Sequence, residues 1–524
     1  MSVWRPEDYF RYKEASKVSR GHYYEPKPMM QFGEKPAEQY APITENPFVT
    51  ATGTKALSTF SIDVDTASYA NMRRFIEQGQ LPPPNAVRLE ELINYFDYQY
   101  DQPDGDVPFS TNLELAGCPW NDNHRLLRIG LQGKDVHVAE RPATNVVFLI
   151  DVSGSMQNQN KLPLLKRGFQ MMVEQLREDD RVSIVTYAGN AGVALEPTSG
   201  DQKKVINDAI EKLTSGGSTH GSAGIEMAYR LAQQNFIAKG SNKVILATDG
   251  DLNVGVTSDD QLVKLIKQKA AEGVFLTVLG FGTGNLKDGK LEKIADNGNG
   301  VYAYIDSLRE ANKVLVQQLS AALLTIAKDV KLQIEFNPAE VKSYRLLGYE
   351  NRALKTEDFD NDRKDAGEIG AGHSVTALYE IVPAKMAKNR RSATPVGLKY
   401  QDAEIPATPD SPEARLANLP AAAKTGELAT VAVRYKLPDA QTSQKLEFAI
   451  KNQEKSFVTA SDDFRFAASV AAFGMLLRGS AYSGDATFDQ IEDIGAGAMG
   501  ADASGYRAEF IDLVRKAAAM SDRR

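Results

Sequence analysis

A short segment in the first third of the chain carries oxygen-bearing side chains at alternate positions. From Asp151 to Ser155 the sequence reads Asp-Val-Ser-Gly-Ser, so one carboxylate is followed by two hydroxyls. The segment directly follows Val146–Ile150, a continuous apolar run typical of a buried strand. Ligands of open α/β sheets bind outside the carboxyl ends of such strands, so these side chains lie where a ligand site is expected.

Two further polar segments occupy comparable places. Thr219 ends the sequence Gly-Gly-Ser-Thr in the loop before a helix predicted to begin near Ala223, and Asp249 directly follows another buried strand. We expect both at loops on the carboxyl edge of the same sheet. The candidate metal ligands are therefore Asp151, Ser153, Ser155, Thr219 and Asp249.

These candidate ligands offer oxygen atoms alone. Such a set suits a hard cation, Mg²⁺, Mn²⁺ or Ca²⁺, and disfavours zinc or copper; Mg²⁺ is the first choice. Two carboxylates neutralise a divalent ion, whereas uncharged hydroxyls leave it receptive to an anionic oxygen. In the competing explanation Asp151 and the serines cap the following helix, which does not account for Thr219 and Asp249. His220, next to Thr219, is expected either on the ligand face or in solvent.

The elements that would position these side chains follow from the hydrophobic pattern. Short continuous apolar runs alternate with helical patterns at Val146–Ile150, Val182–Tyr187, Val244–Ala247, Val274–Leu279 and Val301–Ile305. Runs that are apolar on both faces and separated by helices predict a mostly parallel sheet covered on both sides. The fold class is thus α/β, doubly wound and Rossmann-like.

The regions on either side of this α/β region show other patterns. Before it, helices are predicted near Ala67–Gln78 and Val87–Phe96, and alternation around Leu126–Leu131 completes a small α+β satellite segment. After Ile326 the period changes to two, as from Val330 to Phe336, which predicts an antiparallel, sandwich-like β domain.

Four regions are therefore predicted along the chain. They are a disordered, proline-containing tether or linker at 1–50, the α+β segment at 51–138, the α/β domain at 139–325 and a β-rich domain with terminal helices at 326–524. A Pro/Ala-rich insert at Pro383–Gly426 interrupts the last region, whose helices are expected around Phe466–Leu477 and Tyr506–Ala519.

Composition excludes several classes of protein. The net charge of −8 lacks the basic surplus that nucleic-acid backbones demand. The longest strongly apolar stretch, Phe466–Leu477, is shorter than the ~20 residues needed to span a bilayer. Cys118 is the only cysteine, which removes intramolecular disulfides and thiolate zinc clusters. The charged N-terminus indicates that the chain either stays in the cytoplasm or is numbered after removal of an export signal.

The five candidate ligands match, residue for residue, the metal-ion-dependent adhesion site of the von Willebrand factor A (vWA) family, and the resemblance extends over about Asn145 to Leu324. It implies that a divalent cation in the site captures an Asp or Glu carboxylate of a protein partner, and that the chain is no enzyme. It also suggests that the helix near Leu308–Leu324 transmits the event to the β domain.

The chain also resembles a wider group of bacterial vWA proteins, often exported or lipid-anchored, with an associated segment before the vWA domain and a β-rich domain after it. The sequences beginning at Leu57 and at Asp249 carry this similarity. It implies a protein of the periplasm or cell envelope, with a possible lipid anchor on a missing N-terminus. A cytoplasmic location is the alternative.

Two other functions compete with adhesion. Asp63 and Asp65 resemble the Asp-x-Asp opening of haloacid-dehalogenase-type phosphatases, although Ala67 stands where that family has Thr or Val. The segment Ala56–Ile62 is interrupted by serine and threonine and is not expected to form the buried strand that precedes such a nucleophile, so Asp65 or Thr66 is expected to cap the next helix instead. The other alternative is a cytosolic, metal-gated adaptor of an ATPase or assembly complex.

Overall fold

The computed structural model describes residues 38–136, 141–217, 221–250, 259–283, 286–318, 324–384, 423, 425–453 and 455–521. Contacts divide the chain into the units Met1–Ala37 and Glu38–Arg524, and every described residue belongs to the second. Residues 1–37 of the predicted tether, and 385–422 and 424 of the predicted insert, lie outside the described residues. Residues 38–50 correct the prediction of a disordered tether, because Glu38 ion-pairs with Arg74 at 2.8 Å and β1 (Val49–Thr50) pairs with β12 (Val341–Leu347).

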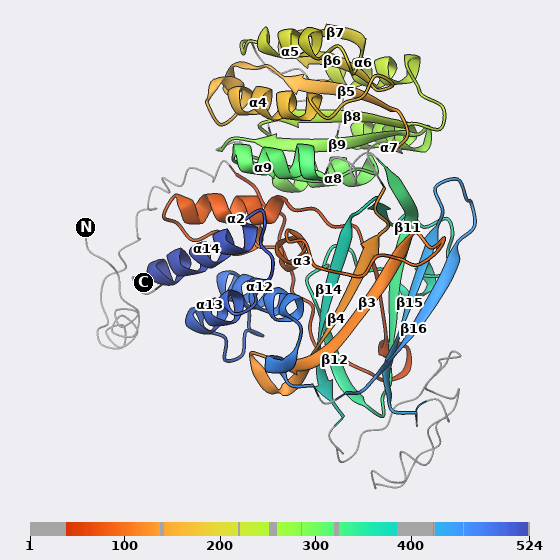
Figure 1. Cartoon of the computed structure of the whole chain (residues 1–524), viewed down its shortest axis with the longest axis vertical. Helices are drawn as coiled ribbons and strands as arrows, with labels where there is room; N and C mark the ends of the chain where they lie inside the picture. Colours follow the sequence, from red (N-terminus) through yellow and green to blue (C-terminus); the bar gives the residue numbers. More distant parts are fainter. Residues whose placement is uncertain are drawn as a thin grey trace, which may run out of the picture. The chain divides into compact units, whose positions relative to one another are not determined.

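A six-stranded sheet forms the α/β domain, with the strand order β10-β9-β8-β5-β6-β7 (Figure 1). Its strands are β5 (Thr144–Asp151), β6 (Arg181–Tyr187), β7 (Ala191–Ser199), β8 (Ser241–Thr248), β9 (Val274–Phe281) and β10 (Tyr302–Ile305). All neighbours are parallel except β7, which is antiparallel to β6. The five predicted apolar runs form the parallel strands. The edge strand β7 was not predicted, because its partly exposed residues lack a continuous apolar run.

Helices cover both faces of this sheet, which confirms the doubly wound fold. Side chains that alternate along β5 enter two separate cores. Phe148 packs with α4 (Leu162–Val173), α5 (Lys203–Glu211) and α9 (Leu308–Asn312). Leu149 belongs to the core on the other face, which also contains residues of α6 (Gly221–Gln234), α7 (Asp259–Ala271) and α8 (Asp288–Asn297). Such two-sided burial explains why the strand sequences are continuously apolar.

Two antiparallel sheets form a β sandwich around one core. One sheet has the order β1-β12-β14-β4-β3, and the other has β13-β11-β15-β16 with β2 paired to β11. The further strands are β2 (Leu57–Ser61), β3 (Phe109–Cys118), β4 (Asn121–Gly133), β11 (Thr325–Phe336), β13 (Gly367–Gly370), β14 (Ser374–Pro383), β15 (Glu427–Lys436) and β16 (Gln444–Lys451). Strands from before and after the α/β domain therefore share both sheets, so the α+β segment is no separate satellite.

Strand β2 corrects the expectation that its serines and threonine would prevent a strand. It pairs antiparallel with β11, and its hydroxyls all have partners. The Ser58 hydroxyl lies 2.8 Å from the Tyr379 hydroxyl, Thr59 accepts a hydrogen bond from Gln333, and Ser61 accepts one from the Gly367 N–H. Hydrogen-bonded hydroxyls can be buried at little cost, so the polar residues are compatible with a strand inside the sandwich.

A fourth core joins helices from the two ends of the described chain. It contains α2 (Ala67–Glu77), α3 (Leu89–Asn94), α12 (Asp462–Arg478), α13 (Phe488–Ala496) and α14 (Tyr506–Ser521). Both predicted terminal helices are present, whereas the short α13 was not predicted. No helix in the described part of the chain is long and apolar enough to span a membrane.

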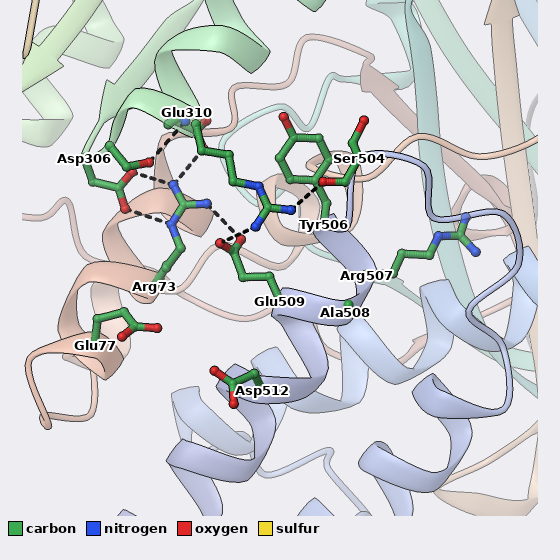
Figure 2. Close-up of polar contacts among 12 residues, drawn as sticks. Arg73, Glu77, Asp306, Glu310, Ser504, Tyr506, Arg507, Ala508, Glu509 and Asp512 are labelled. Atoms are coloured by element: carbon green, nitrogen blue, oxygen red, sulfur yellow. Dashed lines mark hydrogen bonds and ion pairs between the residues drawn. The ribbon is translucent and has the colours of Figure 1, made fainter.

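The last helix of the α/β domain is fastened to this helical region by Arg73 of α2 (Figure 2). The Arg73 guanidinium, which is buried, contacts Asp306 at 2.5 Å and Glu310 at 2.7 Å at the start of α9. It also reaches Glu509 of α14 at 3.1 Å. Beyond α9 the helix widens into a π-helical stretch, Lys313–Gln317. Residues 319–323 of the predicted helix lie outside the described residues.

Candidate metal site

The loop after β5 brings one carboxylate and two hydroxyls together. Asp151 is fully buried, and its Oδ1 accepts a hydrogen bond of 2.9 Å from the Ser153 N–H. The hydroxyl oxygens of Ser153 and Ser155 lie 3.0 Å apart, with Ser153 buried and Ser155 exposed. Burial raises the pKa of Asp151 to about 6, and the nearby charge of Asp249 acts in the same direction. The strand end therefore gathers three oxygen-bearing side chains, of which Ser155 is exposed to solvent.

The neighbouring strand β8 brings the second carboxylate to the same edge. Strands β5 and β8 are parallel and in register, with Ile150 opposite Ala247. Asp249 follows β8 and is 1% exposed. The Thr248 hydroxyl donates to Asp151 Oδ2 at 3.3 Å and so connects the two strand ends directly. The expectation that Asp151 and Asp249 share one sheet edge is confirmed by this pairing.

The loop that leads to Thr219 lies against the Asp151–Ser155 loop. Gly216 N–H donates to the Val152 carbonyl at 2.7 Å, and the Gly154 N–H donates to the Gly217 carbonyl at 3.1 Å. Thr219 and His220 lie outside the described residues. The assignment of Thr219 as a metal ligand, and of His220 either to the ligand face or to solvent, therefore stays a prediction.

Lys161, which was not predicted, also reaches this site. It directly precedes α4, and its Nζ lies 2.8 Å from Asp249 Oδ2. Both side chains are buried, at 5% and 0% exposure. The sequence offered little indication of this contact, because a lysine before a helix is most often exposed to solvent. Tyr187 is a second missed residue, as it lies opposite Asp151 in β6 and is fully buried.

The donor set agrees with a hard divalent cation. Among the described residues, no cluster of three or more His, Cys, Asp or Glu side chains is arranged to hold a metal. The site instead combines two carboxylates with hydroxyls, which favours Mg²⁺, Mn²⁺ or Ca²⁺ over zinc. Asp151, Ser153, Ser155 and Asp249 would hold the ion, with Thr219 as the predicted fifth ligand.

The phosphatase alternative depends on Asp63 and Asp65. Arg352 ion-pairs with both Asp63 and Asp65, at 3.2 Å in each case. Asp65 also accepts a hydrogen bond from the Tyr302 N–H at 2.7 Å, so it does not cap α2. Thr66 makes no side-chain cap, and the Ser68 N–H in the first turn is bound instead by Glu91. Both aspartates are therefore ion-paired with one arginine, and Asp65 also contacts β10 of the α/β domain.

Comparisons with protein-family models cover most of the chain. The model described as von Willebrand factor type A domain matches residues 145–319. A model described as von Willebrand factor matches residues 34–128, and one described as the C-terminal part of the uncharacterized protein YfbK matches residues 321–520. The three matches follow one another along the sequence with short gaps.

The chain is also similar to individual proteins. The uncharacterized protein YfbK of Escherichia coli is 43% identical over 499 residues, which cover 94% of this chain and 81% of YfbK. Human inter-alpha-trypsin inhibitor heavy chain H3 is 27% identical over 265 residues, 47% of this chain and 29% of its own length. A solved von Willebrand factor type A structure from Catenulispora acidiphila is 14% identical with a TM-score of 0.41, and the match covers 78% of this chain and 91% of that one.

Proposed function

Because the chain belongs to the family of bacterial von Willebrand factor type A proteins that includes Escherichia coli YfbK, we propose that it binds a protein partner through a divalent cation. Asp151, Ser153, Ser155, Thr219 and Asp249 would hold the cation, with Mg²⁺ as the first choice. A bound divalent cation supplies an electrophilic centre for an anionic oxygen. The partner's contribution is an Asp or Glu carboxylate.

The observation that carries this proposal is the shared edge of β5 and β8. Asp151 and Asp249 lie at adjacent strand ends connected by the Thr248 hydroxyl, and the Ser153 and Ser155 hydroxyls approach each other at 3.0 Å. Helix capping would require none of this cross-strand geometry. The exposed Ser155 marks the side of the site from which a partner would approach.

A packed route leads from this site to the rest of the molecule. Helix α4 begins directly after Lys161 and packs closely against the last helix of the vWA domain at Gly168. A Cβ atom at Gly168 would lie 3.1 Å from Ala311 and 3.2 Å from Leu315. The first turn of α9 is held in turn by Arg73. Partner binding would shift the position of α9 only in so far as the partner prefers one arrangement of the site.

The location and the absence of catalysis belong to the same proposal. We place the protein at the bacterial cell envelope and assign it no reaction, on the basis of its resemblance to envelope vWA proteins. Fractionation of source cells tests the location. Recovery from the cytosol in complex with an ATPase would favour the adaptor function instead.

The decisive experiment is a pull-down from source cells with Mg²⁺ or with EDTA. Wild-type protein should retain a partner only with Mg²⁺, whereas Asp151→Ala and Thr219→Ala should retain none. Asp179→Ala is the matched control, because it removes an exposed aspartate of the same domain. Retention that is equal with EDTA, or equal in the Asp151→Ala variant, would exclude a metal-dependent interaction.

A further inference from the structure

Lys161 places a buried positive charge beside the predicted metal ligands. Its Nζ lies 2.8 Å from Asp249 Oδ2, and neither side chain is more than 5% exposed. The backbone also fixes its position, because the Lys161 N–H donates to the Asn158 carbonyl and its own carbonyl accepts the first bond of α4 from Leu165. A buried ion pair of this kind is directional and strongly felt by its neighbours.

The end of β9 is shaped to accommodate this lysine. Gly282 has a φ of +74°, and a Cβ atom there would overlap the Cγ, Cδ and Cε atoms of Lys161. The Gly282 carbonyl accepts a hydrogen bond of 2.5 Å from the buried Tyr304 hydroxyl, which holds this turn in place. The lysine therefore crosses from the start of α4, over the end of β9, to the end of β8.

The pair of Lys161 and Asp249 lowers the net negative charge around the candidate site. Asp151 and Asp249 contribute two negative charges, and Lys161 offsets one of them at hydrogen-bonding distance. A site of lower negative charge attracts a divalent cation less strongly. It also neutralises that cation less completely, so an anionic oxygen from outside is attracted more strongly.

We propose that Lys161 is a positioning residue that sets the balance between the two affinities of the site. By pairing with Asp249 it lowers the affinity for the divalent cation and raises the affinity of the cation-loaded protein for a carboxylate. This inference rests on the proposed function, since it assumes that the site binds a cation. It adds a residue outside the five predicted ligands and states in which direction each affinity moves.

The test compares Lys161→Met with wild-type protein, using Mn²⁺ alone and then acetate as a carboxylate probe. Calorimetry gives the Mn²⁺ affinity, and water-proton relaxation of the Mn²⁺-loaded protein gives the acetate affinity. We expect Lys161→Met to bind Mn²⁺ about tenfold more tightly and acetate several-fold more weakly, since one unit charge is removed beside the ion. Lys161→Arg, which keeps the charge, should restore both affinities toward those of the wild type.

Lys166→Met is the matched control, because Lys166 lies on α4, which begins directly after Lys161, and pairs with Glu211 of α5 rather than with a predicted metal ligand. It should bind both probes as the wild type does. If Lys161→Met does not fold, Lys161→Gln replaces it in both measurements. Unchanged or weaker Mn²⁺ binding, or unchanged acetate binding, in the neutral variant overturns the role of Lys161. Absence of Mn²⁺ binding in the wild type and all variants overturns the proposed function itself.

Discussion

Arg73 Nη2 lies 2.7 Å from Glu310 Oε2, and this contact joins helix α2 to the first turn of the last vWA helix (Figure 2). Tyr95 donates a hydrogen bond of 2.8 Å to the same carboxylate oxygen. Because Arg73 and Glu310 are both buried, at 4% and 1% exposure, the pair has little solvent screening. The contact ties the vWA domain to residues from both ends of the described chain, since Glu509 of α14 shares the guanidinium.

Arg73→Met should therefore destabilise the whole protein. The substitution leaves Asp306 and Glu310 without the guanidinium, and removing one partner of a buried pair typically costs about 3–5 kcal/mol. Urea unfolding followed by circular dichroism measures this change. Lys516→Met is the control, because Lys516 also connects α14 to α2, through the half-exposed Glu77, and such a surface pair is worth less than about 1 kcal/mol. Equal losses of unfolding free energy in the two variants would contradict the stabilising role assigned to the buried Arg73 contacts.

Mg²⁺ should stabilise the wild-type protein against unfolding. An ion that binds the folded state alone adds about 2.7 kcal/mol at 100 times its dissociation constant. Thermal unfolding with increasing Mg²⁺ should show a rising midpoint, which EDTA reverses. Asp151→Ala should show no rise, whereas Asp179→Ala should behave as the wild type does. A rise of the same size in Asp151→Ala would assign the ion to another part of the molecule.

Asp288→Asn should change how stability depends on pH. Burial raises the pKa of Asp288 to about 6, so the folded protein holds this proton more strongly than the unfolded chain does. The contribution of Asp288 to folding stability is therefore complete below about pH 4 and is lost as the pH rises through about 6.

The variant should be more stable than the wild type at pH 7, by up to about 3 kcal/mol from the shift of roughly two pKa units, and nearly equal to it at pH 4. Its amide oxygen can still accept the hydrogen bond from the Tyr302 hydroxyl. Chemical denaturation at the two pH values measures the difference. Asp122→Asn, at an exposed position of β4, is the control and should show no such change. A destabilised Asp288→Asn at pH 7 would show that the charge is favourable in the fold.

The sequence predicted the structure best where strands are buried on both faces. The apolar runs of β5, β6, β8, β9 and β10 are enclosed by helices on both faces, so every residue of each run reports the same environment. The alternation from Val330 to Phe336 was equally clear, because one face of β11 enters the sandwich core. The carboxyl-edge location of Asp151 and Asp249 followed from these strands alone.

The pairing of strands that lie far apart in the sequence could not be predicted in this way. Strand β2 pairs with β11 across the entire vWA domain, as with Phe60 opposite Leu332, and no local pattern records such a partner. The hydroxyls of β2 made a buried strand look unfavourable in the sequence, because their hydrogen-bond partners are distant residues such as Gly367. Lys161 was missed for a related reason, since its burial depends on Asp249 and Gly282, which lie far away in the sequence.

Gly282→Ala tests whether the space for Lys161 matters to the fold. A non-glycine residue at a φ of +74° costs about 1–2 kcal/mol. The added methyl group would also displace the Lys161 side chain from Asp249, and overpacking of this kind adds about 1–3 kcal/mol. Gly273→Ala provides the control, because Gly273 has a φ of +88° but its nearest neighbour is Phe236 at 3.4 Å. We expect Gly282→Ala to lower the free energy of unfolding clearly more than Gly273→Ala does, as measured by urea denaturation. Equal losses would mean that the lysine can leave Asp249 without cost, because backbone strain alone would then account for both variants.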